Sequence, residues 1–297
     1  AGPIMPDPKA EARHQPQVEE TANCIPLVNI TAPSSGGVSR NEYEMFNVPD
    51  KGAILNNSYT LSKTELAGYV PGNNNMAERP AKIIVNEVTG AGSTSMDGFL
   101  EVAGNRADVV IANPNGITVN GGGFINTGKA FLTTGKPVYD GEDHLQRFDI
   151  TGGDILIEGK GLGGKETGSL AILSRAVKIN AGIWAKDLHI TTGANSIDAK
   201  TLEASAIEGK GGRPAFALDT AAIGGMYAGR ITLVGTEKGL GVNNSGTWSA
   251  EDNLTLDWNG DLKNSGTIYS KGNTDLRASR LENDKTIAAG KDITISA

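Results

Sequence analysis

Side chains that could act in acid–base catalysis gather in one short stretch of the sequence. Asp140, Glu142, Asp143 and His144 lie almost side by side, and Arg147 follows them. An inverting glycosidase needs two carboxylates on one face, about 6.5–9.5 Å apart. Gly and Pro residues bound this stretch, however, which is typical of a solvated surface loop. We therefore predict no catalytic residues and no enzyme. A β-helical carbohydrate-active enzyme, either a polysaccharide lyase or a glycosidase, is the alternative function.

The other reactive side chains are too scattered to form a metal site or a disulfide. His14, His144 and His189 lie far apart, with no cysteine beside them, so we predict neither a metal ion nor another cofactor. The only cysteine, Cys24, has no partner for a disulfide within the chain. We expect it to be a small buried hydrophobic residue, and an intermolecular thiol is the other interpretation.

Composition excludes two broad classes of partner. Lys and Arg number 27 and Asp and Glu number 34, so a net charge of −7 provides no basic surface for nucleic acid. No apolar run approaches the ~18 residues that a membrane-spanning helix needs. With 40 Gly, 12 Pro and only 38% hydrophobic residues, the 297-residue chain favours short elements around a thin core.

The elements available to position these residues are strands. Strand-sized segments rich in β-branched residues alternate with Gly, Asn and Asp, and no segment keeps a helical period for 10–15 residues. These segments cover residues 25–30, 53–55, 82–85, 109–111, 117–119, 154–157, 177–179 and 231–234. The sequence therefore predicts an all-β fold.

The C-terminal half repeats. Gly182, Gly225, Gly246, Gly266 and Lys285 begin similar segments at steps of 43, 21, 20 and 19 residues, and the first step is close to twice the others. A period of about 20 residues with short strands and Asn or Gly corners predicts a β-solenoid, in which each copy is one coil stacked on the last.

Aligned columns in the last three copies indicate which side chains stack. We expect the apolar columns to point inward and the asparagine column to form a ladder of amide hydrogen bonds. The columns are Val242, Leu262 and Leu281; Asn244, Asn264 and Asn283; Trp248, Ile268 and Ile287; Asn253, Asn273 and Asp292; and Leu256, Leu276 and Ile295.

Several segments fall outside this rhythm. Residues 1–22 hold four prolines and little apolar pattern, which predicts a flexible leader. Residues 68–80, 135–147 and 208–215 are expected to leave the coil as loops or small hairpins. The repeat continues to Ile295 with no polar capping turn. We therefore expect the chain to be the N-terminal piece of a longer protein.

Two asparagine-rich segments stand at predicted corners. Asn113, Pro114, Asn115, Gly116 and Ile117 have the residue types of a type I turn between two strands. A turn alone gives Asn115 no evident use beyond tolerance of its φ angle, so the segment could also be a recognition element.

The second segment, Asn56, Asn57 and Ser58, reads as the corner that follows the predicted strand 53–55.

The order of these segments resembles the N-terminal secretion domain of two-partner-secretion (TPS) exoproteins. That family includes filamentous haemagglutinins, haemolysins and contact-dependent growth-inhibition (CdiA-like) proteins. The resemblance extends roughly from Ile25 to Val234, and the later copies resemble haemagglutinin shaft repeats. The segments that carry it are Pro26 to Ile30, Phe46 to Val48, Gly52 to Asn57, Val85 to Val88, Asn105 to Ile117 and Gly121 to Thr127.

The resemblance implies a fold: a right-handed parallel β-helix with an N-terminal cap and extra-helical hairpins. The flexible leader would cover residues 1–22, the secretion domain 23–240, and the first shaft repeats 241–297. The segment Asn56, Asn57 and Ser58 departs from the haemagglutinin form of its motif and favours the growth-inhibition subgroup.

The resemblance also implies a partner and a location. A TpsB-type (CdiB- or FhaC-like) outer-membrane β-barrel transporter would recognise the domain through its periplasmic POTRA domains, with Asn113 to Ile117 as the signature motif. The exoprotein would then be exported to the cell surface, where this domain would start the folding of the shaft. We expect the isolated domain to be a monomer.

Overall fold

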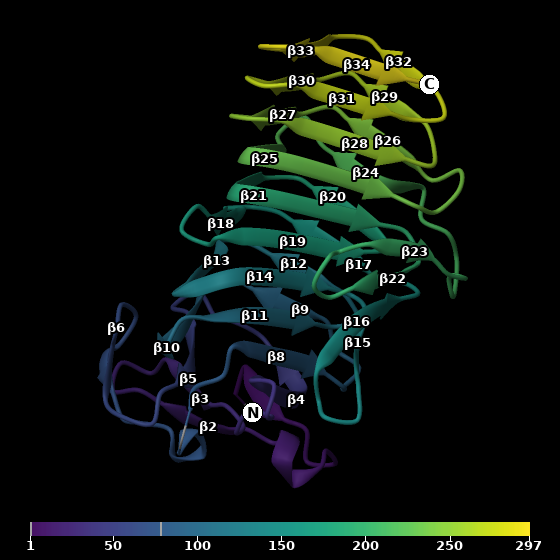
Figure 1. Cartoon of the computed structure of the whole chain (residues 1–297). Coiled ribbons are helices and arrows are strands. Elements are labelled where there is room, and N and C mark those ends of the chain that lie inside the picture. Colours follow the sequence, from purple (N-terminus) through teal and green to yellow (C-terminus); the bar gives the residue numbers. More distant parts are fainter. Residues whose placement is uncertain (1, 78) are drawn as a thin grey trace.

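The computed structural model describes residues 2–77 and 79–297, and these form one parallel β-helix. The coils stack along one axis from the N-terminal end to the C-terminal end (Figure 1). Each complete coil contributes strands to three stacks of parallel strands, and hydrogen bonds join each strand to the coils on either side. The all-β prediction is therefore confirmed. No helix in the described ranges is long and apolar enough to cross a membrane.

The strands of the three stacks follow in chain order. The first stack contains β3 (Pro26–Asn29), β5 (Ala53–Asn57), β10 (Phe99–Gly104), β13 (Gly122–Ile125), β18 (Leu162–Gly164), the starts of β21 (Gly182–Thr192) and β25 (Gly225–Gly235), β27 (Thr247–Ala250), β30 (Thr267–Ser270) and β33 (Thr286–Ala289). The second contains β4 (Val38–Phe46), β8 (Ile83–Val88), β11 (Ala107–Ala112), β14 (Thr127–Thr133), β19 (Ser169–Ser174), the ends of β21 and β25, β28 (Leu254–Trp258), β31 (Thr274–Arg277) and β34 (Ile293–Ser296). The third contains β9 (Thr94–Met96), β12 (Ile117–Val119), β17 (Asp154–Ile157), β20 (Ala176–Ile179), β24 (Phe216–Thr220), β26 (Gly241–Asn244), β29 (Leu262–Asn264) and β32 (Leu281–Asn283).

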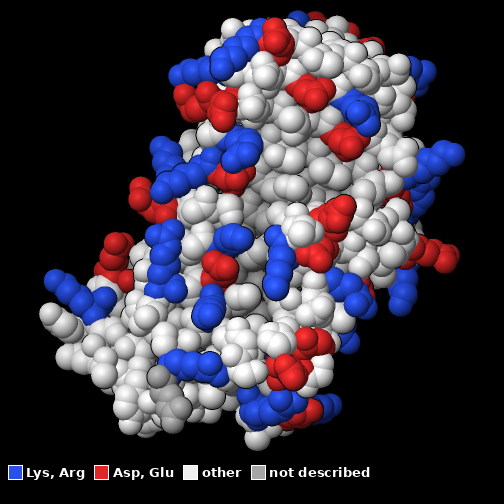
Figure 2. All heavy atoms as spheres, in the orientation of Figure 1, with Lys and Arg blue, Asp and Glu red and all other residues white. Residues whose placement is uncertain are grey.

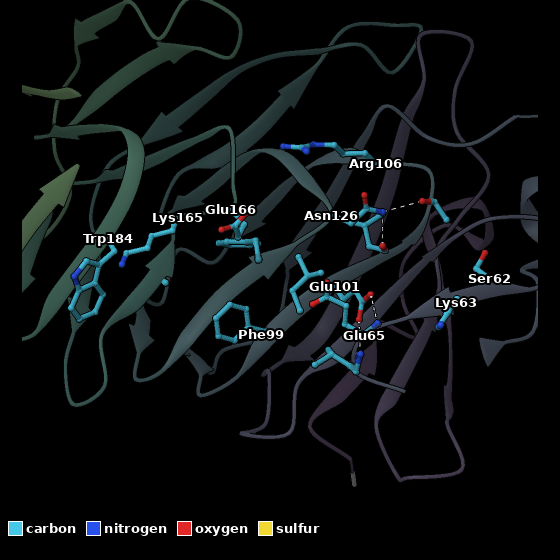
Figure 3. A pocket seen from close by; sticks show the side chains of 16 residues that line it. Ser62, Lys63, Glu65, Phe99, Glu101, Arg106, Asn126, Lys165, Glu166 and Trp184 are labelled. Atoms are coloured by element: carbon cyan, nitrogen blue, oxygen red, sulfur yellow. Dashed lines mark hydrogen bonds between the residues drawn. The ribbon is translucent and has the colours of Figure 1, made fainter. Parts of the chain in front are cut away.

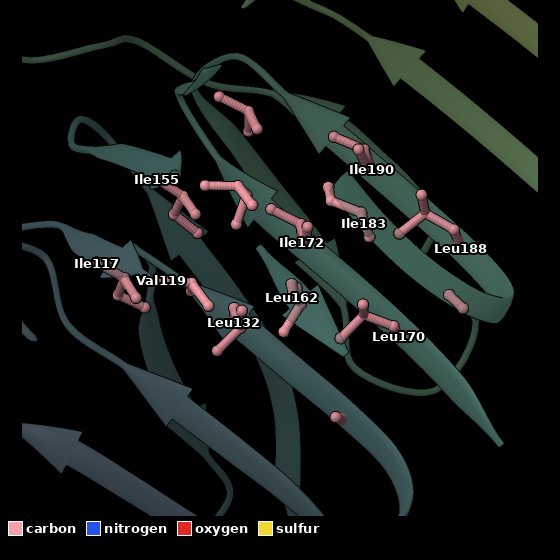
Figure 4. Packing of buried hydrophobic residues seen from close by; sticks show 14 of the residues in the cluster. Ile117, Val119, Leu132, Ile155, Leu162, Leu170, Ile172, Ile183, Leu188 and Ile190 are labelled. Carbon is pink, nitrogen blue, oxygen red and sulfur yellow. The ribbon is translucent and has the colours of Figure 1, made fainter. Parts of the chain in front are cut away.

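Alternation along each strand fills the inside of the coil. In β28, Leu254, Leu256 and Trp258 are buried while Thr255 and Asp257 between them are exposed. Figure 4 shows the result in the middle coils, where branched aliphatic side chains from facing strands meet in a narrow interior. A thin core of this kind needs few aromatic residues.

The columns expected from the last three copies are in register. Val242 pairs with Leu262 and Leu262 with Leu281. Trp248 pairs with Ile268, is fully buried and donates its indole N–H to Thr220 Oγ1 at 3.0 Å. The inward register of this column is confirmed.

Two details of the repeat differ from the sequence alignment. Gly225 pairs with Thr247 rather than Gly246, so the expected register was wrong by one residue at this step. The step of 43 residues from Gly182 to Gly225 is a single coil, because β21 pairs directly with β25. Its extra length goes into β22 (Asn195–Asp198), β23 (Ala204–Ala206) and the loop that follows them.

The N-terminal segment expected to be a flexible leader is folded onto the coil. Strand β1 (Ile4–Pro6) pairs antiparallel with β4, and β2 (Gln17–Glu20) pairs antiparallel with β3. Between them lies the short 3₁₀ turn η1 (Ala12–His14). Ile4 is buried in the main core, which a pair of apolar residues between prolines did not reveal. These antiparallel strands cap the first coil.

Cys24 also differs from expectation. It is exposed rather than buried, and its φ angle of 63° places it in the left-handed region. Its backbone N–H donates to Thr21 O at 2.9 Å, so Cys24 occupies the tight turn between β2 and β3. A turn position leaves its side chain outside the core.

Insertions leave the coil at its corners. Strands β6 (Ser62–Thr64) and β7 (Gly68–Val70) form a hairpin, and the 3₁₀ turn η2 (Asn74–Met76) follows it. Strands β15 (Lys136–Tyr139) and β16 (Leu145–Ile150) form a second hairpin, which joins β22 and β23 in a four-stranded antiparallel sheet. This sheet covers a second hydrophobic core that includes Phe131 and Phe148. The excursions expected at 68–80 and 135–147 are confirmed, whereas β22 and β23 were not predicted.

The tip of the β15–β16 hairpin is held against the N-terminal cap by charges. Asp143 accepts hydrogen bonds from Arg40 and Arg13, each at 2.7 Å. Burial opposes ionisation of Asp143, but these two guanidinium groups outweigh it and lower its pKa. On the cap side, His14 Nδ1 lies 2.9 Å from Glu42 Oε2.

Beside this contact, two carboxylates oppose each other on neighbouring strands. Glu42 of β4 pairs in register with Glu87 of β8. Burial, together with the charge of Glu42, raises the pKa of Glu87 to about 7. Lys136 and Arg40 act in the opposite direction but do not cancel the shift.

We expect Trp248→Asp to lower the free energy of unfolding by about 4 kcal/mol or more, because it removes a fully buried indole and buries a carboxylate. Urea denaturation followed by circular dichroism measures the loss. Ser249→Asp, at the neighbouring half-exposed position of β27, is the matched control and should change little. An unchanged midpoint for Trp248→Asp would contradict the inward register.

We expect Glu87→Gln to change how stability depends on pH. The pKa of Glu87 is raised in the folded state, so the stabilisation from its neutral form is present below about pH 4.5 and is lost as pH rises through about 7. Gln stays neutral, so the variant should gain stability relative to the wild type between pH 5 and 8. Denaturant midpoints at both pH values test this.

Glu282→Gln, at an exposed position, is the control for that experiment. Parallel pH curves for wild type and Glu87→Gln would show that Glu87 ionises as freely in the folded protein as in the unfolded chain.

Candidate functional site

The segment from Asn113 to Ile117 forms the corner between β11 and β12. Gly116 N–H donates to Asn113 O at 3.1 Å and closes the turn. Gly116 has a φ angle of +115°, and a Cβ added there would lie 3.1 Å from Asp154 O in the next coil. Both features favour glycine at this position. The segment is a turn, as its residue types predict.

Asn113 ties this corner to the preceding coil. Its side chain is fully buried, and its Nδ2 donates to Gly92 O and to Thr94 Oγ1, both at 2.9 Å. Its Oδ1 accepts the N–H of Asn115 at 2.9 Å. Every hydrogen bond that the Asn113 side chain makes is therefore to another residue of the domain.

Asn115 has a structural use that the sequence did not reveal. Its side chain is exposed, but Nδ2 donates to Gly90 O at 2.8 Å and to Gly92 O at 3.2 Å. The expectation that a turn needs Asn115 only for φ tolerance was wrong. A carboxylate at this position would lose both donors and face two carbonyl oxygens.

Asn56 and Asn57 also make hydrogen bonds within the fold. Both are fully buried at the end of β5. Asn56 Nδ2 donates to Asn29 Oδ1 at 3.0 Å and to Pro71 O at 2.9 Å. Asn57 Nδ2 donates to Ala81 O and Asn105 O, and its Oδ1 accepts the N–H of Ala81. These two residues fix the insertion between β5 and β8 to the coil.

The two asparagine-rich corners do not form one site. Asn57 contacts the turn that precedes β11, whereas Asn113 follows β11. Six extended residues separate the corners, roughly 20 Å. The predicted motif residues therefore lie at opposite ends of the same strand.

The third predicted set lies several coils away in the third stack. Asn244 Nδ2 donates to Asn264 Oδ1, and Asn264 Nδ2 to Asn283 Oδ1, each at 2.9 Å. A second column also links successive coils, but through the backbone. The side-chain oxygens of Asn253 and Asn273 each accept a backbone N–H group from the next coil. Each such hydrogen bond contributes about 1 kcal/mol net.

Sequence reasoning missed other side chains that join coils. Asn73 donates to Ile30 O and Asn56 O, and Asn126 donates to Val102 O and Gly104 O. Glu101 is buried and accepts the N–H groups of Glu65 and Leu66, each at 2.9 Å. Burial raises the pKa of Glu101, against the effect of these two hydrogen bonds. The sequence offered one signal for such contacts. It is an Asn at a corner, about one coil length after the residue whose carbonyl accepts its hydrogen bond.

The acidic stretch considered for catalysis has structural partners. Asp140 accepts the N–H groups of Glu142 and His144 and shapes the hairpin turn. Asp143 is tied to Arg13 and Arg40, so it is not the free solvated group expected of a surface loop. Across the described residues, no three His, Cys, Asp or Glu side chains group as metal ligands would. Figure 2 shows basic and acidic side chains interspersed over the visible face rather than gathered by sign.

Comparisons with known proteins agree on one family. The family model of the TPS secretion domain matches residues 3–269. "Toxin CdiA" of Yersinia pestis is 42% identical over 294 residues, which cover 91% of this chain and 9% of that protein. "16S rRNA endonuclease CdiA" of Enterobacter cloacae is 43% identical over 94% of this chain and 8% of that protein. The chain thus spans less than a tenth of the length of these relatives.

A solved structure shows the same fold. The crystal structure of a filamentous haemagglutinin secretion domain superposes with a TM-score of 0.88 at 32% identity, over 99% of this chain and 100% of that one. The match includes the N-terminal cap, and the family model runs past residue 240 into the regular coils. The alternative of a carbohydrate-active enzyme finds no support in these comparisons. The chain belongs to the family of TPS secretion domains, found in CdiA- and filamentous-haemagglutinin-like exoproteins that are secreted through the outer membrane to the cell surface.

Proposed function

We propose that this domain directs a CdiA-like exoprotein to a TpsB-type outer-membrane transporter, whose periplasmic POTRA domains bind it, and that it acts as a monomer without catalytic activity of its own. The match of the family model to residues 3–269 is the observation that carries this proposal. Any nuclease or other toxin activity named for the relatives belongs, on this proposal, to parts of those proteins that this chain does not match.

The burial of the motif in the folded domain indicates that the transporter binds it at an earlier stage of export. In the folded domain, Asn113 and Ile117 are buried, and Pro114 and Asn115 are the exposed members of the motif. The preceding strand β11 is hidden as well, because Val109, Val110 and Ile111 have no exposed surface. We propose that the POTRA domains bind the motif in the extended chain, before the coil closes over it.

Outside the cell, the folded coils would template the shaft. Residues 23–240 would act as the secretion domain, and 241–297 as the first haemagglutinin-type repeats. Leu256, Leu276 and Ile295 occupy one column of successive coils. A further coil with the same pattern would stack on β34 and cover Ile295, which is 48% exposed in this structure.

We expect Asn115→Asp to lower the free energy of unfolding by about 1–2 kcal/mol, because two hydrogen bonds to carbonyls are lost and a charge faces their oxygens. Asn115→Ala, which loses the bonds without the charge, should cost less. Urea denaturation of the purified domain measures both. Equal stability of Asn115→Asp and wild type would show that the contacts to Gly90 and Gly92 contribute nothing.

Recognition needs a test that stability does not influence. Chains unfolded in urea are diluted into the purified POTRA domains of the cognate transporter, and binding is measured before refolding. We expect the unfolded wild type to bind more tightly than the prefolded domain, and Asn115→Asp to weaken binding of the unfolded chain. Lys263→Ala, at an exposed position of β29 far from the motif, is the control. Equal binding by all unfolded chains would show that the motif has a structural role only and is not recognised by the POTRA domains.

A further inference from the structure

One outward column of the first stack carries three aromatic side chains, with two glycines between the first and the second. Strand pairing places Phe99, Gly123, Gly163, Trp184 and Tyr227 in register on β10, β13, β18, β21 and β25. At a strand spacing of about 4.8 Å, the four steps of this column extend over roughly 19 Å of the coil axis. We call these five residues the aromatic column.

The rings of this column lie against glycines. A Cβ added at Gly123 would come within 2.4 Å of the Phe99 ring, and one at Gly182 within 2.4 Å of the Trp184 ring. Tyr227 covers Gly225 in the same way. The ring planes of Trp184 and Tyr227 differ by 18°, with centroids 6.1 Å apart. The absence of side chains at these glycines gives the rings room to lie over the backbone.

The lower part of the column forms the floor of a groove of about 1190 Å³. The β6–β7 hairpin forms one wall, and Glu101 holds it by accepting the N–H groups of Glu65 and Leu66. Figure 3 shows Phe99 in the middle of this groove, Trp184 at one end and Ser62 and Lys63 at the other. Phe99 is 37% exposed although it lies in the interior of the groove.

Charges around the groove balance. Three cationic side chains, Lys63, Arg106 and Lys165, line it together with three acidic ones, Glu65, Glu101 and Glu166. Glu101 is occupied by the hairpin, and within residues 2–77 and 79–297 the other five side chains have no ion pair or side-chain hydrogen bond. The six charges of the lining sum to zero, and the five side chains not held by the hairpin still include both signs. The groove therefore offers apolar faces in its centre, and both donors and acceptors at its rim, to a ligand without net charge.

The floor does not suit an extended peptide. Strands β10, β13, β18 and β21 are each paired on both sides by neighbouring coils, so no strand edge is free to bind a peptide backbone. A pyranose ring has an apolar C–H face that packs on aromatic rings and hydroxyls around its edge that hydrogen-bond to charged side chains. A chain of such rings fits the chemistry of the groove, and the three coil steps from Phe99 to Trp184, roughly 14 Å, leave room for more than one ring.

We propose that this groove binds a neutral linear oligosaccharide, with Phe99 and Trp184 stacking on its sugar rings. This binding is separate from secretion, so it is tested on the purified folded domain without the transporter. Trp184 is a convenient reporter, because the other two tryptophans, Trp248 and Trp258, are buried in the core. Cellotetraose and chitotetraose are the neutral probes, and tetragalacturonate is the charged comparison.

We expect at least one neutral probe to change the tryptophan emission saturably at up to millimolar concentration, with the same Kd by calorimetry. Phe99→Ala should weaken this binding about tenfold, since one stacked ring contributes up to about 1.5 kcal/mol. Tyr269→Ala is the matched control, because Tyr269 stands in the same register two coils beyond Tyr227 but outside the groove. It should keep the wild-type Kd.

Three results would overturn the proposal. The first is that neither neutral probe binds at millimolar concentration by either measurement. The second is that Phe99→Ala and Tyr269→Ala weaken binding equally. The third is that tetragalacturonate binds more tightly than both neutral probes, which would contradict the balance of charges. Circular dichroism of Phe99→Ala confirms that the variant is folded before its binding is judged.

Discussion

Parallel pairing in register between coils is the constraint on which this structure depends. Backbone hydrogen bonds run along the axis, so each residue lies directly above its counterpart in the coil below. The burial and the hydrogen-bonding needs of one position are then shared by the equivalent positions of successive coils. Inward columns are mostly apolar, as with Trp248 and Ile268, and where Ser270 and Thr274 replace apolar residues their hydroxyls hydrogen-bond to each other. A corner that has an amide in one coil has it again in the next, as with Asn244 and Asn264.

The same constraint explains where the sequence could be interpreted and where it could not. Equal coil lengths made the columns from Val242 to Ile295 readable as spacing alone. Spacing did not predict the coil between Gly182 and Gly225, because β22 and β23 lengthen this coil without altering its pairing with the neighbouring coils. A single register shift at Gly225 arises where that irregular coil meets the regular ones.

Side-chain roles at corners were harder to predict than the corners themselves. The turn at Gly116 followed from residue types, but the acceptors of Asn115 lie on residues 90 and 92, one coil earlier. Contacts between residues about 25 positions apart leave no local signal. The prediction of a flexible N-terminal segment was wrong for a similar reason. Strands β1 and β2 form by pairing with β4 and β3, and their own sequence carries no strand pattern. In the exposed aromatic column, the repeat aligned Trp184 with Tyr227, but only strand pairing placed Phe99 in the same column.

The antiparallel cap gives the molecule a polarity. Strands β1 and β2 run against their partners and close the coil at its N-terminal end, so no further parallel coil can be added there. A further coil could stack only at the opposite end, on β33 and β34. In this arrangement each coil pairs only with the coil before it and the coil after it, so the last coil is the one with a free side. The β-helix therefore has one end closed by antiparallel strands and one end whose strand edges are open to a further coil.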